Sequence, residues 1–125
     1  MTDLFKSYVL TFDERPAYLY AHLWSDTMTS EVAFEYLREA AEKCAELGYD
    51  KLLLYRDVPV MLPDTDLFSA TTFFLELMNG RRVAFINPHA EIAEDMDYAV
   101  SIGTNRGANY RLFNNFESAE KWLLE

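Results

Sequence analysis

The stretch KLLLYRDVPVMLPDTDLFSATTFFLELMNG, residues 51–80, decides the fold of this chain. It opens with an apolar run over residues 52–55, which is typical of a strand buried on both faces of a parallel sheet. A loop with prolines at positions 59 and 63 follows, and residues 64–79 then have the length and composition of a helix. The stretch therefore predicts half of a strand–helix–strand unit.

The helix expected over residues 64–79 is apolar nearly all the way round, and Glu76 is its only charge after Asp66. A small domain has too little core to bury every face of such a helix, so at least one large apolar side chain should face outward. We expect this helix and the loop before it to contact a protein partner, and we expect the chain itself to form a homodimer through them. The alternative is that the loop folds over the helix and buries these groups within one chain. The residues expected at the contact are Val58, Met61, Leu62, Asp64, Thr65, Phe68 and Phe73.

Residues 4–12 and 17–24 predict an antiparallel hairpin around the polar turn 13–16. The second strand alternates strictly, with Leu19, Ala21 and Leu23 on one face and aromatic rings on the other. We expect the aliphatic face to receive helices. The aromatic face, which carries Tyr18, Tyr20, His22 and Trp24, is either the thinner side of the core or a surface that meets a ligand or another subunit.

Three further helices are predicted along the chain. The first is capped by Thr29 or Asp26, ends at Gly48 and places Cys44 on its buried stripe. The second has Pro88 in its first turn. The third spans residues 116–124 and is capped by Asn114 or Asn115.

With the short strands at residues 83–86 and 110–113, the order of elements indicates an α/β fold in a single domain over residues 1–125. We expect one mixed, mostly parallel sheet of about five strands that starts with an antiparallel hairpin, together with about four helices. The strands at 52–55 and 83–86 should be parallel near neighbours in its middle.

Composition narrows the classes of partner. A net charge of −10 disfavours nucleic acid and anionic membranes, because both are bound by clustered Lys and Arg. The single cysteine cannot form an internal disulfide, and no signal peptide or long uncharged apolar run is apparent. These features favour a cytoplasmic protein.

The side chains that usually carry catalysis or metals are scattered. His22 and His89 do not lie at metal-ligand spacing from each other or from Cys44, and the acids over residues 91–97 are typical of a solvated helix face. We expect His22 to be a hydrogen-bonded structural imidazole and His89 to be solvated. The sequence therefore predicts no enzyme, no metal and no cofactor.

One polar cluster stands at residues 105–107. Gly107 is expected to take a positive φ, Asn105 to make a turn hydrogen bond, and Arg106 to tie the loop to an acid or to carbonyl groups at a helix end. The other interpretation is that Asn105 and Arg106 contact an anion or a partner.

The order of elements, the segments LLLYRDV and RVAFIN, the NRG before YRLF and the ending ESAEKWLL resemble the SpoIIAA-like, or STAS-like, bacterial domains. This resemblance covers nearly the whole chain and implies a non-enzymatic regulatory module that acts through protein–protein contacts. Phosphorylatable antagonists of this superfamily carry an Asp-Ser-Ser-Gly switch before the central helix. Here the region reads Pro63-Asp64-Thr65-Asp66-Leu67, so Thr65 is the one hydroxyl near that place, and Thr65 or Asp64 is otherwise an ordinary helix N-cap.

The resemblance and the apolar helix also suggest a second function. The superfamily's fold is similar to that of lipid-carrying domains, and the apolar helix beside the aromatic sheet face could line a pocket for a small apolar ligand or a lipid. A closed cavity of several hundred Å³ would support this alternative, whereas a flat apolar patch would support the interaction module.

Overall fold

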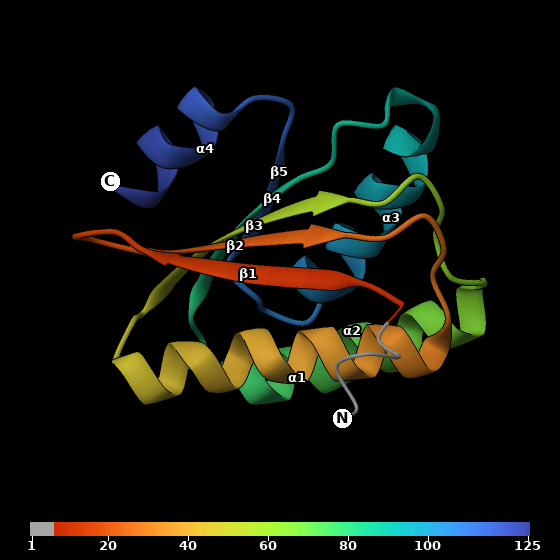
Figure 1. Ribbon diagram of the computed structural model, residues 1–125, viewed down its shortest axis with the longest axis horizontal. Coiled ribbons are helices and arrows are strands. Elements are labelled where there is room, and N and C mark those ends of the chain that lie inside the picture. The colour runs from red at the N-terminus through yellow and green to blue at the C-terminus, as the bar shows by residue number, and fades with distance from the viewer. Residues whose placement is uncertain (1–6) are drawn as a thin grey trace.

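A five-stranded sheet runs through the computed structural model, which describes residues 7–125 (Figure 1). The strands lie in chain order: β1 (Val9–Glu14), β2 (Leu19–Trp24), β3 (Lys51–Asp57), β4 (Arg82–Ile86) and β5 (Tyr110–Phe113). β1 is antiparallel to β2, and the other neighbours are parallel. The predicted mixed sheet with an initial hairpin is confirmed, as are the parallel neighbours β3 and β4.

The helices divide unequally between the two faces of the sheet. α1 (Ser30–Leu47), α2 (Asp64–Met78) and α3 (Ala93–Thr104) pack on one face, and α4 (Phe116–Leu123) is the helix that residues 7–125 place on the other (Figure 1). A short 3₁₀ turn, η2 (Ala90–Ile92), leads into α3. None of the helices in the described part of the chain is both long and apolar enough to cross a bilayer.

The alternation in β2 places side chains in two separate cores. Leu19, Ala21 and Leu23 are fully buried under α1 to α3, as the sequence predicted. On the other face a smaller core forms beneath α4. It comprises Tyr18, Leu53, Ala84, Ile86, Ala119 and Leu123. Because β3 contributes Leu52 and Leu54 to the first core and Leu53 to the second, its run of consecutive leucines is buried on both sides.

Side-chain caps fix the ends of two helices. The Thr29 hydroxyl accepts from the Val32 N–H (3.1 Å), and Gly48 ends α1 with φ +76°. The Asn115 side chain accepts from the Ser118 N–H (2.8 Å) at the start of α4. Thr29 and Asn115 are therefore the caps among the alternatives that the sequence left open.

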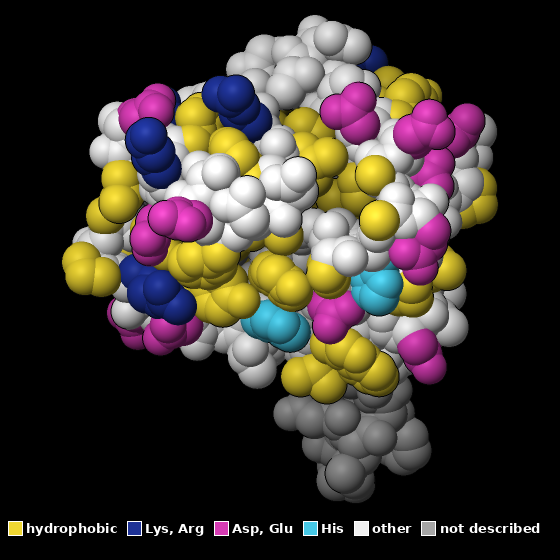
Figure 2. Space-filling model, turned by 90° about the horizontal axis from the view of Figure 1, so that it is seen from above, with side chains coloured by type: hydrophobic (Ala, Val, Ile, Leu, Met, Phe, Trp, Pro, Cys, Tyr) yellow, Lys and Arg dark blue, Asp and Glu magenta, His cyan; other side chains and the backbone are white. Residues whose placement is uncertain are grey.

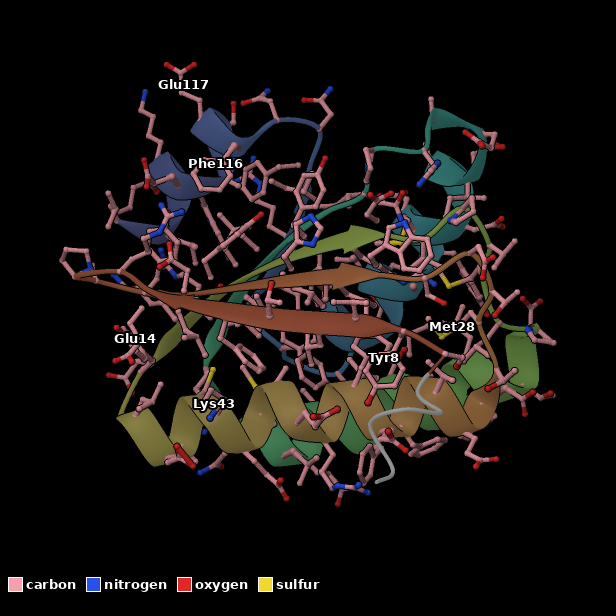
Figure 3. All side chains as sticks on the ribbon, in the orientation of Figure 1. Tyr8, Glu14, Met28, Lys43, Phe116 and Glu117 are labelled. Atoms are coloured by element: carbon pink, nitrogen blue, oxygen red, sulfur yellow. The ribbon has the colours of Figure 1, made fainter. Side chains whose placement is uncertain are left out.

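The edge strand is also fastened to a helix. Tyr8, just before β1, reaches from the sheet to α1, where its hydroxyl donates to the Glu35 carboxylate (2.8 Å) and also contacts that of Glu39 (Figure 3). Burial and these two carboxylates raise the pKa of Tyr8. The contact holds the hairpin over the first helix.

Some predicted boundaries are wrong. β1 continues through Asp13 and Glu14, which the sequence assigned to the turn, and the turn is closed by the Arg15 N–H donating to the Tyr18 carbonyl (3.1 Å). Residues 4–6 of the predicted first strand lie outside the described residues. Pro88 lies outside any helix, because the Asn87 side chain accepts from the His89 N–H (2.9 Å) and makes a turn ahead of η2.

Cys44 is fully buried on α1, and burial raises the pKa of its thiol from 9.0 to about 11. Between pH 9 and about 11 the Cys44 thiol is therefore protonated in the folded state and ionised in the unfolded chain. The contribution of the protonated thiol to the free energy of unfolding is present below pH 9 and is lost as pH rises from 9 to about 11. We expect the free energy of unfolding to fall more steeply across this window in the native protein than in Cys44→Ala. Urea denaturation of both at pH 8, 9.5 and 10.5 measures the difference. Equal slopes would contradict the burial of the thiol.

Candidate protein-binding site

The loop between β3 and α2 is fixed by buried side chains and by hydrogen bonds to its backbone. Val58 and Leu62 point into the core, and the buried guanidinium of Arg56 donates to the Val58 carbonyl (3.2 Å) and the Val60 carbonyl (2.8 Å). The Asn87 amide donates to the Val58 carbonyl as well (3.0 Å). The backbone of the loop is therefore fixed, while the Val60 side chain is 40% exposed and Met61 is half-buried.

α2 begins without a side-chain cap. Pro63 occupies the N-cap position, and neither Asp64 nor Thr65 accepts a capping hydrogen bond, so the predicted N-cap role of these two residues is wrong. Asp64 and Thr65 both lie exposed in the first turn, where acids interact favourably with the helix dipole. The Thr65 hydroxyl makes no hydrogen bond within residues 7–125 and is open to solvent.

One face of α2 carries the aromatic ring of Phe68 with threonine and serine side chains around it. Thr65, Phe68, Ser69 and Thr72 follow a spacing of three and four, so they share this face. Ser69 and Thr72 donate to the carbonyls of Thr65 (3.3 Å) and Phe68 (3.0 Å), which turns their hydroxyls back onto the helix. Phe68 remains 44% exposed.

Among residues 7–125, Arg106 contacts neither an acid nor a helix-end carbonyl; its contact is with an aromatic ring. Its guanidinium lies over the Phe68 ring, 4.6 Å from the centroid, and so joins the end of α3 to α2. Gly107 has φ +89° as expected, and Asn105 caps α3 through its backbone N–H rather than its side chain. The contact of Asn105 and Arg106 with an anion or a partner stays a prediction.

The predicted contact residues separate into two groups. Val58 and Leu62 are buried, and Phe73 packs on the Phe34 ring of α1 with centroids 4.8 Å apart. Met61, Asp64, Thr65 and Phe68 are at the surface. These last four, with Val60 and Arg106, form the candidate site, which we call the α2 surface.

A cavity lies beneath the α2 surface. It offers about 60 Å³ and is lined by apolar groups from α1, α2 and α3, together with Arg56 and Tyr110. The Tyr110 hydroxyl has no hydrogen-bond partner among residues 7–125, and burial raises the pKa of Tyr110. Pockets for small organic ligands commonly measure about 300 to 1,000 Å³. The cavity is therefore too small to support the lipid-binding alternative.

Sequence reasoning missed a polar pair at the carboxyl end of the sheet. The His89 Nε2–H donates to Asp57 Oδ1 (2.7 Å), and His89 Nδ1 lies 3.9 Å from a Glu91 carboxylate oxygen. His89 is thus paired rather than solvated. The sequence did contain a signal for this pair. Asp57 is the last residue of β3, and residues 87–89 directly follow the neighbouring parallel strand β4. The carboxyl ends of parallel strands lie at the same edge of a sheet, so these residues could be expected to meet.

The aromatic face of β2 is only partly covered. Phe116, which projects from α4 toward the sheet (Figure 3), packs on Tyr20. His22 lies flat on Tyr55, with ring centroids 5.1 Å apart. His22 makes this stacking contact but no hydrogen bond within the described residues, so its predicted hydrogen-bonded role is wrong. Trp24 packs in neither core and is 46% exposed.

No protein-family model and no curated protein sequence matches this chain. Among solved structures, the crystal structure of an anti-sigma factor antagonist from Mycobacterium paratuberculosis is similar, with a TM-score of 0.68 over 95% of this chain and 96% of that chain. The two sequences are 8% identical over the match. This likeness establishes a shared fold.

Proposed function

We propose that this chain, which has the fold of an anti-sigma factor antagonist, is a non-enzymatic regulatory module that binds a protein partner through the α2 surface. The similar protein is, by its name, one that acts on another protein. The observation that carries the proposal is the exposure of Phe68, a large ring held on a rigid helix beside exposed polar groups. Rigid aromatic side chains with a polar rim are typical of the centre of a protein interface.

The α2 surface is already ordered before any partner arrives. Arg56 fixes the loop backbone and Arg106 restrains the Phe68 ring, so little conformational entropy remains to be lost on binding. A partner would bury Val60 and Phe68 and would meet Asp64 and Thr65 at the rim.

A second copy of the chain is one partner that this proposal includes. The exposed part of α2 offers one large exposed ring per copy, because Phe73 is half-buried against the Phe34 ring and the buried residues of α2 serve the internal core. Burying a large apolar side chain stabilises by roughly 1.5 to 3 kcal/mol, and a dimer would bury two Phe68 rings and gain twice this amount. Association itself costs several kcal/mol, which offsets most of that gain. We therefore expect a homodimer through α2 to form only at about millimolar concentration, and a different protein to be the main partner.

The test is a comparison of two aspartate variants on the same helix. Phe68→Asp places a charge at the centre of the α2 surface and should reduce capture of the partner at least tenfold. Leu77→Asp is the matched control, since Leu77 is 36% exposed and lies nine residues, or about half a turn, away around α2. Each tagged protein is used as bait in cells of the native host after chemical crosslinking, and captured proteins are quantified by mass spectrometry.

Thermal unfolding of both variants by circular dichroism controls for folding. A partner lost with Phe68→Asp and retained with Leu77→Asp supports the proposal. A partner captured equally by both variants places the interface elsewhere on the molecule.

A further inference from the structure

α4 leaves part of its face of the sheet open. The helix packs on β3, β4 and β5, while toward the carboxyl-terminal ends of β2 and β3 the side chains on this face stay partly exposed: Tyr55 packs at the margin of the α4 core, and Trp24 is exposed. Register pairs His22 with Tyr55 and Trp24 with Asp57, so these four side chains share one face. Neighbouring strands lie about 5 Å apart and alternate residues about 7 Å apart, which makes a compact square. We call this square the β2–β3 patch.

Figure 2 views the molecule from the α4 side. Both histidines appear on this face, with an acidic side chain between them and hydrophobic side chains beside them. The patch is therefore at the surface, on the opposite side of the sheet from α2 (Figure 1).

Trp24 lacks the kind of partner that most of the other partly exposed aromatic rings have. Several aromatic side chains carry a cation from the same chain: Arg15 lies over Tyr20 and Phe116, Lys43 over Phe12, Arg82 over Trp122, Arg106 over Phe68, and Arg111 over Phe113. The other tryptophan, Trp122, has its cation 4.7 Å from the ring centroid. Within residues 7–125 the indole of Trp24 has no cation, stacked ring or hydrogen-bond partner. Tryptophan is the aromatic side chain that attracts cations most strongly.

A carboxylate stands next to this open ring. Asp57 pairs with Trp24 across the strands, and its Oδ1 is fixed by His89. Its Oδ2 has no partner in the described part of the chain, and the side chain is 32% exposed. The patch therefore combines an unoccupied indole face with an oriented carboxylate oxygen.

The charge around the patch is negative. Glu91 lies beside His89, Asp26 is exposed two residues beyond Trp24, and the whole chain carries −10. Within residues 7–125, no lysine or arginine side chain makes an ion pair, a hydrogen bond or a cation–π contact with any of the four patch residues. Such a field attracts basic segments and repels the phosphates of nucleic acids and anionic lipids.

We infer that the β2–β3 patch binds an arginine side chain from a basic segment of a partner protein. The guanidinium stacks on the indole of Trp24 and donates to Asp57 Oδ2, and the aliphatic stem of the arginine lies toward His22 and Tyr55. Arginine fits better than lysine because its planar group stacks on the ring and donates to the acid at the same time. This surface is separate from the α2 surface, so one molecule can hold two partners at once.

The test uses ¹⁵N-labelled protein and the peptide acetyl-Gly-Arg-Gly-Arg-Gly-amide as probe. The two tryptophans give separate indole N–H signals, and we expect that of Trp24 to shift with the amides of residues 22–25 and 55–58, while that of Trp122 stays in place. Trp24→Ala and Asp57→Asn should each weaken binding at least fivefold. Glu42→Gln, which removes one charge from the exposed face of α1, should change the affinity less than twofold. The peptide with lysine in place of arginine should bind more weakly.

Because Trp24 is exposed, Trp24→Ala should fold normally, and Trp24→Phe should restore part of the binding. Shifts spread evenly over the acidic surface, no shifts at all, or equal affinity in Trp24→Ala and Glu42→Gln would overturn the inference. Shifts centred on Trp24 that grow with protein concentration without peptide would also overturn it, because the occupant would then be a second copy of the chain.

Discussion

Arg56→Ala should lower the free energy of unfolding by about 2 to 4 kcal/mol. Arg56 is 4% exposed, and its strong hydrogen bonds go to the carbonyls of Val58 and Val60, with the thioethers of Met61 and Met96 at 3.9 and 3.8 Å as weak acceptors. Hydrogen bonds from a charged donor are each worth about 1.5 to 3 kcal/mol, and part of this is offset because the variant no longer buries a charge.

The loss should be concentrated in the loop. Asn87 still donates to the Val58 carbonyl in the variant, so the Val60 carbonyl is the group left without its donor. Amide exchange should therefore increase most over residues 58–63, and binding at the α2 surface should weaken with it. Urea denaturation measures the change in stability, and hydrogen exchange locates it.

Two further variants separate the causes. Arg38→Ala removes an exposed arginine from α1 and should cost less than about 0.5 kcal/mol. Arg56→Met fills most of the space without donating, so the difference between Arg56→Met and Arg56→Ala measures the cavity. An Arg56→Ala protein as stable as the native one would mean that the guanidinium does not hold the loop.

Gly103→Ala should destabilise the protein by about 1 to 3 kcal/mol, although Gly→Ala within an open helix stabilises by about 1 kcal/mol. A Cβ at Gly103 would lie 2.6 and 2.8 Å from two ring carbons of Tyr110. That ring cannot move aside easily, because it is buried against Phe74 and Phe85 with centroids 6.0 and 5.3 Å away. Helix α3 would have to shift away from β5.

Thermal and urea unfolding measure this effect, with Thr104→Ala as the control on the same helix because Thr104 is exposed. The double variant Gly103→Ala/Tyr110→Leu should lose less than the sum of the two single changes, since the smaller side chain relieves the overlap. A Gly103→Ala protein more stable than the native one would show that the glycine is not required for this close approach.

The candidate site was only partly predictable. The sequence located the α2 surface because residues 64–79 are too apolar for one sheet to cover. The sequence could not show which aromatic ring of α2 stays exposed to solvent. The apolar residues of this helix are spread around its whole circumference, so they do not mark one face as the buried one. Phe34 on α1 packs on Phe73 and leaves it half-buried, and the end of α3 brings Arg106 onto Phe68.

Local patterns determined the elements of this protein. Alternation in β2, the leucine run of β3 and the Thr29 and Gly48 caps depend on neighbours within a few residues, so the strands, helices and α/β class follow from the sequence alone. The tertiary structure decided which side chains meet across long separations. His89 and Asp57 are 32 residues apart, and Trp24 is farther still from Asp57 along the chain. Their proximity comes from the register of parallel strands, which is set by packing of the whole sheet against its helices, and no local pattern specifies that packing.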